Sequence, residues 1–355
     1  MSQDISKLDR NFALEAAMAE DGLIYRNAAR TPFDLRGLLV EEEGFVRIPG
    51  TVARAASENV TILNTHTSGG RVRFLTDSAR IAIRVRWSAL WHMPHMPLTG
   101  SSGFDLYREG EYCHSFIPPT NSQTGYSGTY TEEKTGLHAY EINFPLYNPV
   151  AALEIGLEPG CTLQTPSAYD RPPVIFYGHS ITQGGCASRP GTCHVNMLAR
   201  WLRCDIRNLG FSGSARGEMA VAEYIAKQEM SIFVMDYADN APDADFLRET
   251  HYPFLMKVRQ AQPDLPILLL SASQIRFSPR GHGAKRDVVR ESYEKRLAAG
   301  DRHIHFLDGE TLYAGEDWFE CTVDRAHPND LGFYRMAQTL KPILQRLMNG
   351  DEKNI

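Results

Sequence analysis

The sequence has 355 residues and a mass of 39.9 kDa, so we expect two domains, since roughly 100 to 200 residues per domain is usual. Hydrophobic residues make up 43% and charged residues 23%, which excludes a fibrous or intrinsically disordered chain. A formal net charge of -6 and a pI near 6.1 argue against a nucleic-acid partner, because a nucleic-acid-binding surface carries a basic excess.

The N-terminal residues 1–23 contain acidic side chains throughout and lack the apolar core of a secretory signal. No apolar run approaches the roughly 18 residues that a membrane-spanning helix needs. We therefore expect a cytoplasmic chain without a membrane partner, whose cysteines are reduced thiols. Cys186 and Cys193 form the one close pair, and whether they make a disulfide stays open.

The first 165 residues divide into two stretches of different sequence pattern. Residues 1–45 open with an amphipathic, helix-prone pattern and are expected to form a helical or irregular arm. Residues 46–165 show a two-residue rhythm, as at 81–87 and 151–158, with turn residues at short intervals. Many short alternating strands without helices between them predict an all-β, jelly-roll-like sandwich domain.

The pattern changes after Thr165–Pro173, a polar stretch with three prolines that is the expected linker. Beyond it, apolar runs alternate with segments of helical period up to residue 350. Alternation of this kind predicts an α/β domain over residues 172–350, with a parallel sheet of about five strands covered on both faces. The predicted strands are 174–178, 206–210, 232–237, 267–271 and 304–308.

A candidate nucleophile lies where the first of these strands ends. The stretch VIFYGHSITQGG places Ser180 just beyond an apolar run, and ligands of open α/β sheets bind beyond the carboxyl ends of strands. A serine nucleophile needs a base and a group that orients the base. Asp324 precedes His327 by three residues, which lets the carboxylate reach Nδ1 and leaves Nε2 free to face the serine.

Candidate donors for an oxyanion follow the next two strands. Gly213 comes after the second apolar run and can present a backbone N–H beside that of Ser180, and Asn240 comes after the third run and offers a side-chain amide. Taken alone, each also suits an ordinary turn or helix cap. Their order on successive connections of one predicted sheet favours a shared site.

Four blocks of this sequence, GHSIT, NLGFSG, DYADN and DRAHPND, resemble those of the SGNH, or GDSL-like, hydrolases over residues 173–347. The resemblance implies a flavodoxin-like α/β/α fold with Ser180 as nucleophile, His327 as general base and then acid, and Asp324 as its orienting residue. It also implies an oxyanion hole of the Ser180 N–H, the Gly213 N–H and the Asn240 amide. Ahead of these blocks, SGFDLY is similar to the GxDLY signature of a sandwich domain that precedes some SGNH domains.

The sequence departs from the common family pattern in two places, since His179 stands where Asp is usual and Ala-Asp-Asn replaces Gly-Thr-Asn-Asp. We place His179 and Trp91 in the substrate pocket as a hypothesis. Trp91 belongs to a loop that also carries His92 and His95, and a metal site there is not expected because no third ligand lies nearby in sequence.

The expected function is a serine esterase without metal or cofactor that forms an acyl-enzyme on Ser180. Family resemblance favours small acyl esters, with O-acetylated carbohydrates as the first guess. Two alternatives stay open: an acyltransferase that passes the acyl group to an alcohol other than water, and a non-catalytic carbohydrate-binding protein. The oligomeric state cannot be predicted from the sequence.

Overall fold

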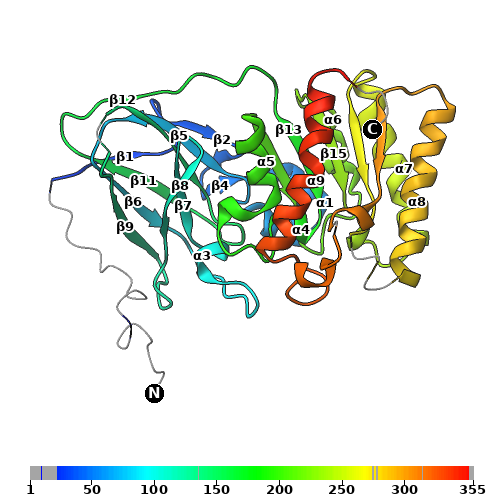
Figure 1. Cartoon of the computed structure of the whole chain (residues 1–355), viewed down its shortest axis with the longest axis horizontal. Helices are drawn as coiled ribbons and strands as arrows, with labels where there is room; N and C mark the ends of the chain where they lie inside the picture. Colours follow the sequence, from blue (N-terminus) through cyan, green and yellow to red (C-terminus); the bar gives the residue numbers. More distant parts are fainter. Residues whose placement is uncertain are drawn as a thin grey trace.

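The computed structural model describes residue 9 and residues 22–134, 136–273, 276, 279–313 and 315–351. A β-sandwich and an α/β domain lie side by side, and the chain between them runs as an extended linker (Figure 1). The start of the predicted arm, residues 1–21, falls outside the described part except for Asp9. In the described ranges no helix has the length and apolarity needed to cross a membrane.

Two antiparallel sheets build the sandwich. The first has the strand order β1-β11-β6-β9, and the second has the order β12-β5-β10-β7-β8, with β2 added beside β5. The strands of the first sheet are β1 (Ile24–Asn27), β11 (Ala152–Leu157), β6 (Arg80–Arg86) and β9 (Gly125–Thr131). Those of the second are β12 (Leu163–Gln164), β5 (Arg71–Thr76), β10 (His138–Asn143), β7 (Phe104–Arg108), β8 (Glu111–Phe116) and β2 (Asp34–Arg36).

The sandwich core follows from the alternation of apolar residues along the strands. Ile83 on β6 pairs with Ile155 on β11, and both side chains are fully buried. Phe74 and Leu106 from the second sheet pack into the same cluster. Because side chains of a strand alternate between faces, each sheet contributes one apolar face to this core.

The sandwich domain begins earlier than the predicted residue 46. Strand β1 completes the first sheet by pairing with β11, and a hairpin of β3 (Leu39–Glu41) and β4 (Gly44–Val46) follows. These strands are too short for an alternating pattern to stand out in the sequence. The region after them also contains three short helices that we did not predict: α1 (Gly50–Ala56), α2 (Glu58–Asn64) and α3 (Leu98–Ser101).

The α/β domain has the predicted parallel sheet. Its strand order is β14-β13-β15-β16-β17, with β13 (Val174–Gly178), β14 (Ile206–Gly210), β15 (Ile232–Asp236), β16 (Ile267–Leu270) and β17 (Ile304–Leu307). The chain therefore reverses its direction of winding at β13, whose neighbours are β14 and β15. Ligands of doubly wound sheets bind outside the carboxyl ends of the strands at such a switch point.

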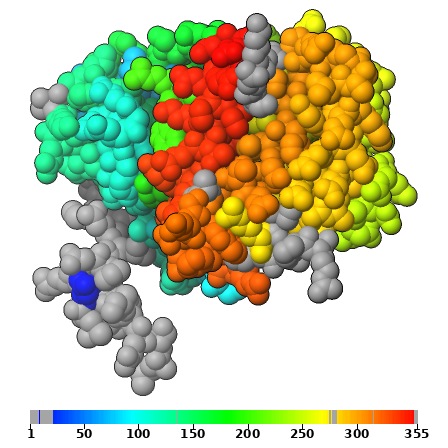
Figure 2. Space-filling view, turned by 45° about the vertical axis from the view of Figure 1, so that its right-hand side comes forward, coloured from blue at the N-terminus to red at the C-terminus, as the bar shows by residue number. Residues whose placement is uncertain are grey.

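Helices cover both faces of this sheet and make a three-layer α/β/α fold. One face packs on α5 (His194–Leu202) and α9 (Asp330–Met348). The other packs on α6 (Met219–Ala226), α7 (Ala244–Ala261) and α8 (Pro279–Ala298), joined by α1 and α2 of the N-terminal region. Figure 2 shows α9, in red, on the surface between the sandwich and the yellow and orange segments that include α8. Short 3-10 helices lie at Pro190–Thr192, Ala238–Asn240, Gly309–Thr311 and Trp318–Cys321.

Buried polar contacts join the two domains. Arg71 of β5, with 0% exposure, donates to the Asp205 carboxylate over 2.6 Å, just before β14. Arg47 donates to the carbonyl of Gly210 and lies over the ring of Phe211, with 4.4 Å from its guanidinium carbon to the ring centroid. A buried charge needs a partner of opposite charge or several hydrogen bonds, so these contacts fix how the domains meet.

Candidate active site

Ser180 is the first residue of α4 (Ser180–Gln183), directly after β13. The turn between them is tight, since a Cβ at Gly178 would collide with the Thr182 side chain and the Asp236 carbonyl. Only glycine fits there. The sequence GHSIT thus sets the serine hydroxyl at the carboxyl end of the sheet, with its backbone N–H among the first N–H groups of a helix, which have no partner inside the helix.

The structure brings Ser180, His327 and Asp324 together in one hydrogen-bonded row. The Ser180 Oγ lies 2.9 Å from His327 Nε2, and His327 Nδ1 lies 2.8 Å from Asp324 Oδ2. Because the Asp324 carboxylate can only accept, the ring proton resides on Nδ1 and Nε2 is left to accept from the serine hydroxyl. This is the orientation in which an imidazole acts as a general base.

A turn before α9 holds the carboxylate of this row. The other oxygen of Asp324 accepts from the N–H groups of Ala326, at 2.9 Å, and His327, at 2.7 Å. Partial burial raises the pKa of Asp324, but these N–H groups and the imidazole outweigh it and lower the pKa below its ordinary value. These contacts therefore favour the ionised form of Asp324, as an orienting carboxylate requires.

The segment after β14 brings Gly213 to the same edge of the sheet. Gly213 has a φ of +66°, a left-handed conformation that favours glycine, and it is exposed. Ser212 beside it donates its N–H to Gln183 Oε1 of α4 over 3.0 Å, which ties this loop to the nucleophile helix. The role of the Gly213 N–H as an oxyanion donor stays a prediction.

Asn240 differs from its predicted role in this geometry. Its amide nitrogen donates to the carbonyls of Phe211 and Ala215, each over 3.1 Å. Exchanging the amide oxygen and nitrogen would set three acceptors against one another, so this orientation is required. Both N–H bonds are committed to the loop that carries Gly213. Asn240 therefore positions that loop, and in this conformation it has no N–H left for an oxyanion.

His179 does not line a substrate pocket, contrary to the hypothesis from the sequence. It is 2% exposed, and its Nδ1 accepts the Ile181 N–H over 3.1 Å, which caps α4. Its Nε2 lies 3.3 Å from Asp236 and 3.4 Å from Asp239. Burial lowers the pKa of His179, but the two carboxylates outweigh burial and raise it above the ordinary value. Histidine thus performs the capping that an aspartate would supply at this position.

The loop from Ser88 to Pro97 reaches the site, though His66 lies between its Trp91 and the α4 helix that begins with Ser180. Trp91 is 42% exposed and packs edge-on against His66, with ring centroids 4.7 Å apart. His66 in turn lies 3.4 Å from the Gln183 amide of α4. The residue of this loop that meets the row is His95, whose ring centroid lies 5.7 Å from that of His327.

Two more residues at the site were missed from the sequence. Tyr147, from the sandwich domain, donates its hydroxyl to the Ser180 carbonyl over 3.1 Å. Cys186, just after α4, is 4% exposed and bonds through its N–H to the Pro328 carbonyl beside His327. Both Cys186 and Cys193 are free thiols in the structure. Neither residue has a sequence motif of its own, because each reaches the site only through tertiary packing.

Comparison with known families gives a match for each of the two domains. The GDSL-like lipase/acylhydrolase family matches residues 171–345, and the GxDLY family, the N-terminus of SGNH-hydrolase-type esterases, matches residues 23–163. No curated protein matches the sequence.

Solved structures of similar architecture span nearly the whole chain. A protein described as a GDSL-like lipase from Bacteroides ovatus is 26% identical with a TM-score of 0.83, covering 92% of this chain and 98% of that one. The salicylyl-acyltransferase SsfX3 of a tetracycline biosynthetic pathway is 20% identical, with a TM-score of 0.77 and coverage of 93% and 99%. A family two carbohydrate esterase from Cellvibrio japonicus is 12% identical, with a TM-score of 0.63 and coverage of 92% and 98%. At such identities the last two show the fold alone.

The order of the two matched families along the chain agrees with the two domains of the structure and with the four sequence blocks. The chain belongs to the SGNH, or GDSL-like, hydrolases that carry a GxDLY domain ahead of the catalytic domain.

Proposed function

We propose that this protein is a serine esterase that hydrolyses carboxylic esters of small acyl groups through an acyl-enzyme on Ser180. The observation that carries the proposal is the row of Ser180, His327 and Asp324, with 2.9 Å and 2.8 Å between successive polar atoms. Both distances are those of hydrogen bonds that already have the geometry needed for proton transfer.

In the first half of the reaction, the Ser180 Oγ attacks the carbonyl carbon of the ester while its proton passes to His327 Nε2. The carbonyl oxygen becomes an oxyanion, which the N–H groups of Ser180 and Gly213 stabilise. His327, now cationic, is stabilised by the Asp324 carboxylate at Nδ1. The imidazolium then gives its Nε2 proton to the departing alcohol, and the acyl group remains on Ser180.

In the second half, water attacks the acyl-enzyme. His327 Nε2 takes a proton from the water, a second oxyanion forms and collapses, and the proton returns to Ser180 Oγ as the acid leaves. Every step uses the same three side chains. No metal or organic cofactor enters this mechanism.

Support for carbohydrate esters comes from the neighbours and from the loop beside the site. Several of the similar structures are described as carbohydrate esterases, one of them from Clostridium thermocellum in complex with cellohexaose and another an acetyl xylan esterase. Trp91 exposes 42% of its surface on the loop whose His95 contacts the row, and aromatic side chains commonly line ligand pockets. We therefore expect Trp91→Ala to raise KM for an O-acetylated sugar and to leave KM for p-nitrophenyl acetate unchanged. An unchanged KM for both substrates would remove Trp91 from the pocket.

Ser180→Ala tests the proposal. We expect purified Ser180→Ala to lose at least about 10⁴-fold in kcat for p-nitrophenyl acetate, because the nucleophile and its base act as a unit. Ser188→Ala, eight positions further along the chain, is the matched control and should retain the activity of the unaltered protein. Turnover by a folded Ser180→Ala protein at the rate of the control would reject the proposal.

An acyltransferase is the second candidate, and the similarity to a salicylyl-acyltransferase favours it. The acyl-enzyme is common to both reactions, so only the acceptor distinguishes them. Product analysis with added sugars and alcohols distinguishes the two reactions. A hydrolase releases free acid at a rate that the additions do not change. A transferase forms a new ester with the added sugar or alcohol, and its rate falls when no such acceptor is present. A non-catalytic carbohydrate-binding protein would show neither product and no labelling by a fluorophosphonate.

A further inference from the structure

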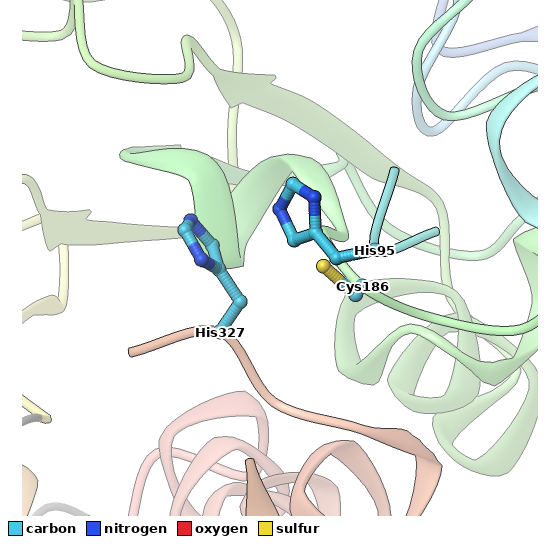
Figure 3. Close-up of side chains that lie close together, drawn as sticks. All are labelled: His95, Cys186 and His327. Carbon is cyan, nitrogen blue, oxygen red and sulfur yellow. The ribbon is translucent and has the colours of Figure 1, made fainter. Parts of the chain in front are cut away.

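Three side chains of the kinds that bind transition metals meet beside the nucleophile. His95 comes from the loop between β6 and α3, Cys186 follows α4, and His327 precedes α9 (Figure 3). One ligand atom from each residue lies within 4.8 Å of the others. We call these three residues the His-Cys-His cluster.

The histidine of the row is already oriented as metal-binding histidines are. Histidines that bind metals commonly donate their second ring N–H to a carboxylate, which fixes the ring and raises its basicity. His327 does this through Nδ1 toward Asp324, over 2.8 Å, so its free lone pair is on Nε2. Ser180 Oγ approaches that same atom from 2.9 Å. A cation and the serine proton therefore compete for one lone pair.

The other two ligands lie beside His327 (Figure 3). Cys186 is fixed there by the hydrogen bond from its N–H to the Pro328 carbonyl, over 3.0 Å, one residue after His327. His95 is exposed, and its ring lies edge-on to that of His327 at 62°. A buried thiol and a fixed imidazole thus face an exposed imidazole that has room to adjust.

This donor set selects among cations. Two imidazoles and a thiolate suit Zn²⁺, which binds nitrogen at about 2.0–2.1 Å and sulfur at about 2.3 Å in a tetrahedron, and they suit Mg²⁺ and Ca²⁺ poorly. Ligand atoms at the corners of such a tetrahedron are roughly 3.5 Å apart. The ligand atoms of the cluster lie within 4.8 Å of one another, so binding draws them closer together, and rotation of the exposed His95 ring brings its nitrogen toward the other two.

We propose that the His-Cys-His cluster binds Zn²⁺ reversibly and that the bound ion inhibits the enzyme by occupying Nε2 of His327. Zn²⁺ accepts the lone pairs of His95, of His327 Nε2 and of the Cys186 thiolate, and a water molecule completes the tetrahedron. The proton of Cys186 passes to solvent.

Inhibition is the first test, and it alone rests on the esterase proposal. The full chain, freed of metal by a chelator, is titrated with Zn²⁺ during hydrolysis of p-nitrophenyl acetate. We expect inhibition that excess chelator reverses and that Mg²⁺ does not reproduce. His95→Gln and Cys186→Ala should each weaken inhibition by at least 10-fold, since altering the surroundings of a metal ligand already weakens binding about 10- to 100-fold. His92→Gln, in the same loop but outside the cluster, should not.

A binding measurement separates this inference from the esterase proposal. Co²⁺, which replaces Zn²⁺ at sites of this kind, should give the Ser180→Ala protein a thiolate-to-metal charge-transfer absorption that is absent in Ser180→Ala combined with Cys186→Ala. If the protein has no esterase activity but shows this absorption, the site stands and the esterase proposal fails. Equal Zn²⁺ sensitivity in all variants, an effect of His92→Gln equal to that of His95→Gln, absence of the absorption, or activation by Zn²⁺ would each overturn the inference.

Discussion

The two domains contribute to the site in different ways. The α/β domain supplies the whole row of Ser180, His327 and Asp324, at the ends of elements that a parallel sheet brings to one edge. The sandwich supplies none of these, and instead contacts the nucleophile residue and the loop after it. Its Tyr147 bonds the Ser180 carbonyl, and its Asp105 binds the loop that follows the nucleophile. The chemistry and its support thus lie in separate domains.

The GxDLY motif illustrates this division. Asp105, with 0% exposure, accepts the N–H of Gly191 over 2.7 Å and the Arg189 guanidinium over 3.1 Å, both in the α/β domain. Tyr107 contacts the same arginine and lies under Arg200, with 4.0 Å from its guanidinium carbon to the ring centroid. The motif therefore marks the joint between the domains. Its function is to fix the position of the active-site loop.

Asp324→Asn has the largest expected effect and concerns the α/β domain alone. An asparagine keeps the size of the side chain but removes the charge that holds the His327 proton on Nδ1. We expect kcat to fall by roughly 10³- to 10⁴-fold, as loss of the orienting carboxylate does in serine proteases. Thermal unfolding should change little, because the side chain of Asp324 is 37% exposed. Full activity in the variant would remove Asp324 from the row.

Asp105→Ala is expected to reduce stability, in contrast to Asp324→Asn, whose expected effect is on kcat. It removes the carboxylate that accepts from the Gly191 N–H, the Arg189 guanidinium and the Asn143 amide. We expect a loss of about 3–5 kcal/mol in the free energy of unfolding, measured in urea, because breaking a buried ion pair leaves uncompensated polar groups. Asp245→Ala, at an exposed surface pair, is the control and should change stability by less than about 1 kcal/mol. Equal effects of the two variants would contradict the role given to the motif.

Tyr147→Phe tests the hydrogen bond between the sandwich and the nucleophile residue. The variant loses the hydrogen bond to the Ser180 carbonyl and keeps the ring. A neutral hydrogen bond contributes about 1 kcal/mol, so we expect kcat to fall by less than about 10-fold with KM nearly unchanged. A fall as large as that of Asp324→Asn would mean that the sandwich takes part in the chemistry itself.

Glu132→Gln has the smallest expected effect and depends on pH. Burial raises the pKa of Glu132, but the Lys134 N–H and the Arg108 guanidinium outweigh it and lower the pKa from 4.5 to about 2. A carboxyl whose pKa is lowered by folding stabilises the folded state above its unfolded pKa and ceases to do so as pH falls through the folded value. The variant should thus be less stable near neutral pH, though by less than Asp105→Ala, because the glutamine amide keeps an acceptor oxygen. That difference should shrink as pH falls from 4.5 toward 2 in urea unfolding; a difference independent of pH would contradict the assignment.

Much of the fold was predictable because its elements carry periodic signals. The five parallel strands lie in mainly apolar runs of the sequence, and the structure has a strand at each of them. Strands of the sandwich that alternate clearly, such as β6 and β11, were predicted as well. Residues 24–64 were not, because their strands are three or four residues long, and because α1 is stabilised by packing against α6 and α2 by packing against α1. Packing of that kind leaves no local pattern.

Residues of the site were likewise predictable only where a local sequence motif contains them. Ser180, Asp324 and His327 belong to local motifs, so the sequence singled them out. His179 was misplaced because a motif shows which residue follows a strand and not whether its side chain points up or down. His95 was set aside as a ligand because no partner lies nearby in sequence, yet Cys186 and His327 are brought to it from distant segments. Only the folded chain places these three side chains together.

The most direct test of the account is to identify the atom that becomes acylated. The protein is treated with a fluorophosphonate or stopped during turnover of an activated ester, then digested and analysed by mass spectrometry. We predict one adduct, on the peptide that contains Ser180, formed far more slowly in His327→Ala and not at all in Ser180→Ala. An adduct on any other residue, or hydrolysis that proceeds with Ser180 unmodified under saturating reagent, would contradict the account.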